Sequence, residues 1–189
     1  MYKYILLLSL SFFLCQCQSG DSSSENASGI GALEAAYDAN PSGENLQNLL
    51  NAYTTDSTGK YLEKQAYLQL SNNRFREGLP ALKKVLKNNL KAKHALALAS
   101  AYEQQQNQVA AQVAYQAYLK TFPNDGQVAE IKQRLSTGIP PLLENLSGLF
   151  EKTKNDSLRR AEPKIVSEYV AAAEALALIA PQSLSLIHI

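Results

Sequence analysis

The chain has 189 residues and carries 18 lysines and arginines against 17 aspartates and glutamates, which gives a formal net charge of +1. This balance supplies no long-range positive field, so we expect no nucleic-acid partner. The chain contains two cysteines, two histidines and no tryptophan. A nucleophile paired with histidine, or a zinc site, needs several of these residues close together. We therefore expect no catalytic residues, no metal site and no cofactor.

The first residues have the pattern of an export signal. Lys3 precedes an apolar run from Ile5 to Leu14, which is too short to span a bilayer. Two cysteines follow this run, and Leu14 stands three residues before Cys17. This arrangement resembles the leader of bacterial lipoproteins and implies a signal peptide over residues 1–17 that ends at an acylated Cys17. The alternatives are acylation of Cys15, plain secretion without a lipid, or a metal-binding Cys-x-Cys.

Two further segments lie outside the predicted folded part. Residues 18–29 are rich in Ser, Asp, Glu and Asn and have little to bury, which predicts a flexible linker. The last six residues, Leu184 to Ile189, resemble the translation of a transposase mosaic end used in sequencing libraries. We interpret residues 184–189 as an adapter scar, with a natural apolar tail as the alternative. We expect the natural chain to continue beyond Ser183.

The dominant signal along the remaining chain is helical periodicity. Apolar residues recur at intervals of three and four in runs that begin at Leu46, Leu62, Phe75, Ala95 and Ala111. Breakers separate these runs: they include Pro41, Gly59, the Asn-containing segments at 71–73 and 87–89, Pro123 and Gly138. Ser42 is the predicted N-cap of the first run. Because no comparable stretch alternates with period two, we predict an all-α fold.

A shift of the chain by 33 residues brings similar residues into register. It places Ala66 on Ala99, Gly78 on Ala111, Leu82 on Tyr115, Val85 on Tyr118 and Leu90 on Pro123. A repeat of this length is typical of antiparallel helix pairs stacked into an α-solenoid. The small residues are expected where the two helices of a pair cross. Tyr102, Tyr115 and Tyr118 are expected to fill the wedge between that pair and the next, and Pro123 ends the second helix.

These residues resemble the tetratricopeptide repeat. Its order of small residue, tyrosine, small residue, aromatic and terminal proline is met by Ala99, Tyr102, Ala111, Tyr115 and Pro123. Residues 59–91 are a weaker match, with Gln69 in the tyrosine's place and Leu90 in the proline's. Residues 30–54 resemble a degenerate earlier pair, so the repeat-like region spans residues 30–124. The resemblance implies a right-handed superhelix with a concave, peptide-binding face and no catalytic activity of its own.

The region 125–183 is expected to hold further helices. Val128, Ile131 and Leu135 form the inward face of one predicted helix, and an apolar stripe runs from Leu142 to Phe150. Pro163 suits the first turn of a last helix, which Pro181 closes. This last helix has the composition that would begin more repeats.

The strongest candidate for a functional surface is a run of basic residues. We assign Arg74, Arg76, Lys83, Lys84, Lys87 and Lys91 to it as a dock for an acidic peptide or an anionic envelope glycan, with a solvated outer face as the alternative. Lys83, Lys87 and Lys91 are expected to share one helix face. His94 is predicted to be a surface residue. The triplet Asp156 to Leu158 resembles an acceptor for O-linked glycan.

Two functions are consistent with these patterns. The first is a non-enzymatic lipoprotein scaffold in the envelope of a diderm bacterium, anchored in the outer membrane, facing the periplasm and binding a protein or peptide in its concave groove. The second is the N-terminal binding portion of a larger lipoprotein with an enzymatic or nutrient-binding domain. We favour the first, because the residues present do not support chemistry.

Overall fold

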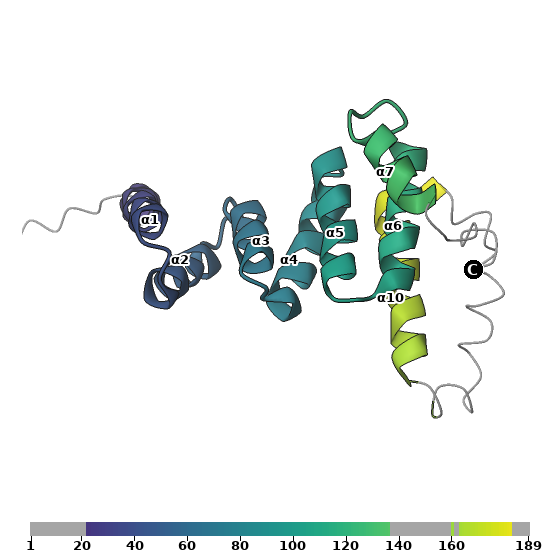
Figure 1. The fold of residues 1–189 in the computed structure, drawn as a ribbon. Helices are drawn as coiled ribbons and strands as arrows, with labels where there is room; N and C mark the ends of the chain where they lie inside the picture. The colour runs from purple at the N-terminus through teal and green to yellow at the C-terminus, as the bar shows by residue number, and fades with distance from the viewer. Residues whose placement is uncertain (1–21, 137–159, 161–162, 183–189) are drawn as a thin grey trace, which may run out of the picture.

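The computed structural model describes residues 22–136, 160 and 163–182, and no strand occurs among these residues (Figure 1). The all-α prediction is therefore confirmed for this part of the chain. The helices are α1 (Ser22–Ala39), α2 (Gly43–Thr55), α3 (Leu62–Ser71), α4 (Phe75–Asn88), α5 (Ala92–Gln104), α6 (Gln108–Thr121), α7 (Val128–Ser136) and α10 (Pro163–Ile179). Helices α1 to α6 follow one another across Figure 1, with α7 and α10 beside α6.

Several sequence predictions concern residues outside these ranges. They are acylation at Cys17 or Cys15, the apolar stripe at 142–150, the glycan acceptor at 156–158 and the adapter scar at 184–189. All of them stay predictions.

The predicted helix boundaries are confirmed at three positions. Ser42 is the N-cap of α2, and its Oγ accepts a hydrogen bond of 3.2 Å from the backbone N–H of Asn45. Pro163 is the first residue of α10, where its missing N–H costs nothing. Pro123 directly follows Phe122, the C-cap of α6. Local backbone chemistry therefore determines these boundaries.

Helix α1 begins earlier than the apolar periodicity indicated. Its first residue is Ser22, inside the segment 18–29 that we expected to be a linker. Apolar periodicity detects the part of a helix that is buried, here from Ile30 onward, which is 6% exposed. It does not detect a polar extension of the same helix, so α1 reaches farther toward the N-terminus than predicted.

The 33-residue period recurs in the backbone. Shifting α4 by 33 residues moves both of its ends, Phe75 and Asn88, onto the ends of α6, Gln108 and Thr121. The same shift moves the last residue of α3 onto the last residue of α5. The sequence register is therefore also a register of helix boundaries.

The turns that end α3 and α5 have the same geometry. Asn73 and Gln106, 33 residues apart, both have left-handed backbones, with φ of 58° and 59°. In each turn the next residue donates a backbone hydrogen bond five residues back, from Arg74 to Gln69 and from Asn107 to Tyr102. This pattern is the Schellman motif, which satisfies the free carbonyls at a helix end. Each turn therefore leads the chain from one helix into the next in the same way.

The small residues of the predicted crossings are buried. Ala66 and Ala99 are fully buried and Ala111 is 2% exposed. At Gly78 in α4, a Cβ atom would lie 2.8 Å from Cδ2 of Leu70 in α3. That distance is below the van der Waals limit, so α3 and α4 approach each other as closely as they do because this side chain is absent.

The tyrosines assigned to the wedge are also buried. Tyr102, Tyr115 and Tyr118 are 2%, 4% and 0% exposed. The hydroxyl of Tyr115 donates to Glu103 at 2.8 Å, and that of Tyr118 donates to Asp125 just beyond the end of α6. Their rings therefore belong to the core, and two of their hydroxyls bind carboxylates at its edge.

The described helices after α6 complete this core. Ile131 of α7 is 4% exposed, and Val128 and Leu135 pack against the same cluster, as predicted. Helix α10 packs along α6 through a face that is fully buried at Ala172, Ala175, Leu176 and Ile179. Thr121 at the end of α6 donates a hydrogen bond of 2.9 Å to the backbone carbonyl of Ile179. The buried face of α10 thus covers α6.

Replacing Ala99 with Leu should lower the free energy of unfolding by about 1 to 3 kcal/mol, because the added atoms have no room at a fully buried position. Chemical denaturation followed by circular dichroism measures this change. The control is Ala129→Leu, the same substitution at an exposed position of α7. Equal stability of the Ala99→Leu variant and the unsubstituted protein would contradict close packing at this position.

Candidate binding groove

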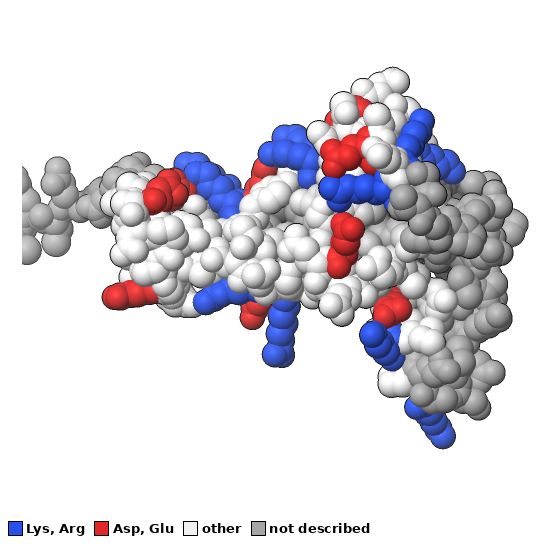
Figure 2. All heavy atoms as spheres, viewed as in Figure 1, with Lys and Arg blue, Asp and Glu red and all other residues white. Residues whose placement is uncertain are grey.

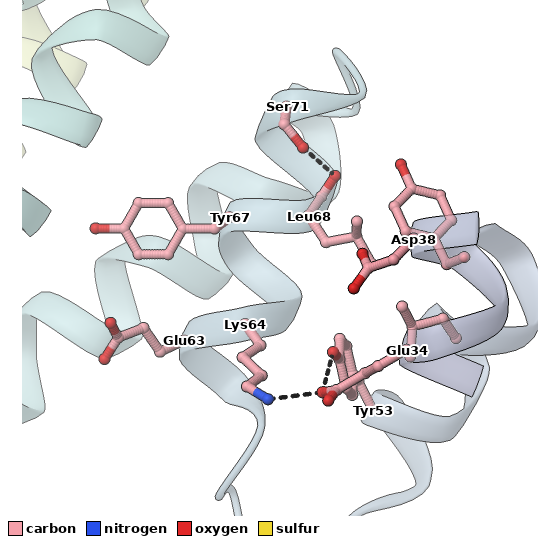
Figure 3. Close-up of a pocket in the computed structure, with 10 residues that line it drawn as sticks. Glu34, Asp38, Tyr53, Glu63, Lys64, Tyr67, Leu68 and Ser71 are labelled. Carbon is pink, nitrogen blue, oxygen red and sulfur yellow. Dashed lines mark hydrogen bonds and ion pairs between the residues drawn. The ribbon is translucent and has the colours of Figure 1, made fainter. Parts of the chain in front are cut away.

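The main hollow among the described residues lies between α1, α2 and α3 and has a volume of about 510 Å³ (Figure 3). This volume is in the range of sites that hold small molecules or several peptide side chains. The lining residues are Glu34, Tyr37 and Asp38 of α1, Leu49 and Tyr53 of α2, and Glu63, Lys64, Tyr67, Leu68 and Ser71 of α3. We call this hollow the α1–α3 groove.

Helix periodicity positions the two walls of the groove. Glu34 and Asp38 are one turn apart on α1, so they share a face. Lys64 and Leu68 are likewise one turn apart on α3, and Figure 3 shows them on the side of α3 that faces α1. Leu49 of α2 is 2% exposed and forms part of an apolar floor. The groove therefore combines charged walls with an apolar base.

Glu34 connects three helices through one carboxylate oxygen. Its Oε1 accepts hydrogen bonds from the Tyr53 hydroxyl at 2.6 Å and from Nζ of Lys64 at 2.7 Å. The hydrogen bond from Lys64, and next the one from Tyr53, lower the pKa of Glu34 below its usual value. Burial, followed by the Glu34 carboxylate, raises the pKa of Tyr53. Glu34 is thus held as a carboxylate and Tyr53 as a neutral phenol.

An aromatic stack supports the floor of the groove. The rings of Tyr53 and Tyr61 lie with centroids 5.3 Å apart and planes 11° apart, which is a stacked arrangement. Lys60 and Lys64 place their ammonium groups 5.1 and 5.8 Å from the centre of the Tyr61 ring. This stack links the end of α2 to the start of α3, so the floor is held by contacts from both helices.

Asp38 differs from Glu34 in having no partner. It is exposed and makes no hydrogen bond or ion pair with any other described residue. Its neighbour Tyr37 is partly buried, and the Tyr37 hydroxyl accepts a hydrogen bond of 3.1 Å from the side-chain amide of Asn72. Asp38 is therefore a free carboxylate beside a positioned ring.

Glu63 and Tyr67 lie at the edge of the groove, where Figure 3 shows them pointing to the other side of α3. There Glu63 binds Lys93 of α5, and its Oε1 is 3.3 Å from Nε2 of His94. Mainly because of the hydrogen bond from Lys93, the pKa of Glu63 is lowered. Burial raises the pKa of Tyr67 to about 12. These groups join α3 to α5.

The prediction that His94 is a surface residue is wrong, because its side chain is fully buried. Its Nδ1 lies 2.9 Å from the backbone carbonyl of Asn89 in the turn before α5, and its ring is 6.1 Å from that of Tyr67. The position of His94 within α5 did not reveal that α3 covers it. His94 packs within the joint between successive helix pairs.

The predicted basic surface is divided by the structure. Lys83 forms an ion pair with Glu174 of α10 and lies 5.8 Å from the centre of the Tyr102 ring. Arg74 precedes α4 and donates to the side chain of Gln47 at 3.1 Å. The side chains of Arg76, Lys84, Lys87 and Lys91 are exposed and make no hydrogen bond or ion pair with other described residues. The predicted docking set is therefore partly used for internal contacts.

One feature predicted for the basic surface is wrong. Lys83 and Lys87 lie one turn apart in α4, but that helix ends at Asn88, and Lys91 is the N-cap residue of α5. Lys91 therefore does not share a helix face with the other two. On the face shown in Figure 2, basic and acidic side chains alternate along the molecule. The charges in this view form no broad basic patch.

The α1–α3 groove was not predicted from the sequence. Tyr53 entered the helical periodicity, whereas Glu34, Asp38 and Tyr67 were not singled out. The available signal was a pair of carboxylates one turn apart in the weakest repeat-like segment. Which face of α1 meets α3 depends on tertiary packing, so this signal alone does not locate a groove.

Two searches among the described residues gave no site of another kind. No group of three or more His, Cys, Asp and Glu side chains in the described ranges is placed to hold a metal ion. None of the helices described here has the length and apolar character needed to cross a membrane. Comparisons of the chain with protein-family models, with curated proteins and with solved structures find no match.

Glu34→Gln should lower the free energy of unfolding by roughly 0.5 to 1 kcal/mol near neutral pH, because the ion pair with Lys64 is lost while an acceptor for Tyr53 remains. A carboxyl with a lowered folded-state pKa stabilises the fold above its unfolded-state pKa. That stabilisation disappears as the pH falls through the folded-state pKa. The difference between the variant and the unsubstituted protein should therefore disappear in acid.

Urea unfolding at neutral and acidic pH measures both values. Glu44→Gln is the matched control, since Glu44 is an exposed α2 residue that makes no hydrogen bond or ion pair with other described residues. Its effect should be small at either pH. An equal loss of stability at both pH values for Glu34→Gln would contradict the assigned role of the carboxylate.

Proposed function

We propose that the protein is a non-enzymatic scaffold of stacked antiparallel helix pairs that binds a segment of a partner protein. The observation that carries this proposal is the open α1–α3 groove, which lies where the first helix pair, α1 and α2, meets α3 of the next. Hollows between successive units are where repeat proteins present extended binding surfaces. The tyrosines and mixed charges of the groove are also typical of protein interfaces.

The matching backbones support the stacked arrangement. The second and third pairs, α3–α4 and α5–α6, share their helix ends, their left-handed turn residues and their buried small residues at a spacing of 33. Successive pairs are also joined in the same way. Glu34 pairs with Lys64, and Glu63 pairs with Lys93, each 30 residues farther along the chain. These are the regularities that a tetratricopeptide-like solenoid requires.

We place this scaffold in the envelope of a diderm bacterium, held to the outer membrane by acyl chains on Cys17 and facing the periplasm. The leader sequence supports this location, because its apolar run ends at a cysteine preceded by Leu14. Two or more acyl chains are needed for a stable anchor, since a single chain binds a membrane only reversibly.

The anchor is tested by Cys17→Ala in the full chain. We expect the variant to move from the membrane fraction to the soluble fraction, because it has no cysteine thiol at the lipidation position. Cys15→Ala is the control and should remain with the membranes. If the Cys17 variant sediments with membranes and the Cys15 variant does not, the lipid is on the other cysteine.

Binding in the groove is tested with a photo-crosslinking amino acid at Ser71, an exposed residue of the lining. In native cells this position should give a crosslinked adduct of one defined mass. The same amino acid at Asn48, which is exposed on α2 and outside the lining, should give none. Adducts of equal yield at both positions, or none at Ser71, would count against a partner in the groove.

A further inference from the structure

We propose that the α1–α3 groove binds an arginine side chain presented by an extended segment of the partner protein. This inference rests on the proposed scaffold function and specifies the chemistry of the partner. It is argued from the charge, the rings and the apolar floor of the groove.

The charge of the groove favours a cation. Its α1 wall carries two carboxylates one turn apart, Glu34 and Asp38. Glu34 uses Oε1 for Tyr53 and Lys64, while its Oε2 accepts no hydrogen bond from another described residue. Asp38 has both oxygens free, as described above. An incoming guanidinium can therefore pair with Asp38 without displacing an internal contact, whereas an acidic segment would meet like charge.

The aromatic rings favour the same ligand. Tyrosine faces attract cations, and the guanidinium group stacks on rings more readily than an ammonium does. This chain already uses such contacts, with Lys60 above Tyr61 and Lys93 above Tyr67 at 5.1 and 5.9 Å from the ring centres. Tyr37 lines the groove beside Asp38, and its hydroxyl is held by Asn72. The free carboxylate and a positioned ring are thus neighbours.

The apolar floor accounts for the stem of the ligand. Leu49 and Leu68 line the groove below the charged wall. Arginine buries its three methylene groups against apolar surface while its charged end stays at the rim. A peptide segment satisfies all three parts of the groove, because it supplies the cation, the stem and a backbone that continues along the surface.

Peptide titrations followed by NMR test the proposal and detect weak binding. The isotope-labelled full chain in non-ionic detergent is titrated with the blocked peptide Gly-Leu-Arg-Leu-Gly and with matched peptides that carry Lys, Gln or Glu in place of Arg. The Arg peptide should shift the backbone amides of α1 and α3 and bind most tightly. The Lys peptide should bind less well, and the Gln and Glu peptides should leave these amides unshifted.

Variants of Asp38 locate the cation. Asp38→Asn should weaken binding of the Arg peptide roughly threefold and Asp38→Lys roughly tenfold, as expected for one partly exposed ion pair removed or reversed. Glu44→Gln removes an exposed carboxylate from α2 outside the groove and should leave the affinity unchanged. Asp38 is exposed, so these variants should keep the fold, which the dispersion of the same spectra verifies.

Three outcomes would overturn the inference. They are binding of the Gln or Glu peptide as tight as that of the Arg peptide, unchanged affinity in Asp38→Lys, and no amide shift in the groove with any peptide. None of these results removes the scaffold itself, which the Ser71 crosslink tests separately. A crosslinked partner together with a failed Arg titration would mean that the groove is used but recognises another chemistry.

Discussion

The structure depends on the close approach of paired helices at positions where side chains are very small. Gly78 lies against Leu70 with no space for a Cβ, and Ala99 is fully buried at the corresponding stage of the next pair. Dispersion attraction falls steeply with separation, so a short distance between helices gives many more productive contacts. The larger rings of Tyr102 and Tyr118 then fill the space left beside each pair. Small and large side chains therefore have complementary roles.

The joints between pairs are of a different kind. Glu34 with Lys64, and Glu63 with Lys93, are partly exposed ion pairs between first helices of successive pairs. Exposed ion pairs contribute little free energy, typically below about 1 kcal/mol each. Their value here is geometric, because each fixes which turn of one helix faces the next. The same joint at Glu34 also orients the carboxylates of the α1–α3 groove.

Much of the fold could be predicted from the sequence, because it depends on local rules. Periodicity, the Ser42 cap and the prolines locate the helices, and the 33-residue register identifies the buried small residues. The groove could not be predicted, since it depends on which faces of α1 and α3 meet. His94 was misassigned for the same reason: its neighbours Glu63 and Tyr67 come from another helix. Lys83 is a further case, because its partner Glu174 is remote in sequence.

The identical turns after α3 and α5 have a consequence for how such a chain can change. Asn73 and Gln106 give the backbone the same exit direction, so the end of one pair is geometrically interchangeable with the end of the other. Unequal recombination between the two coding segments would add or remove a whole pair and preserve every junction. The chain can therefore lengthen or shorten in evolution without any redesign of its interior.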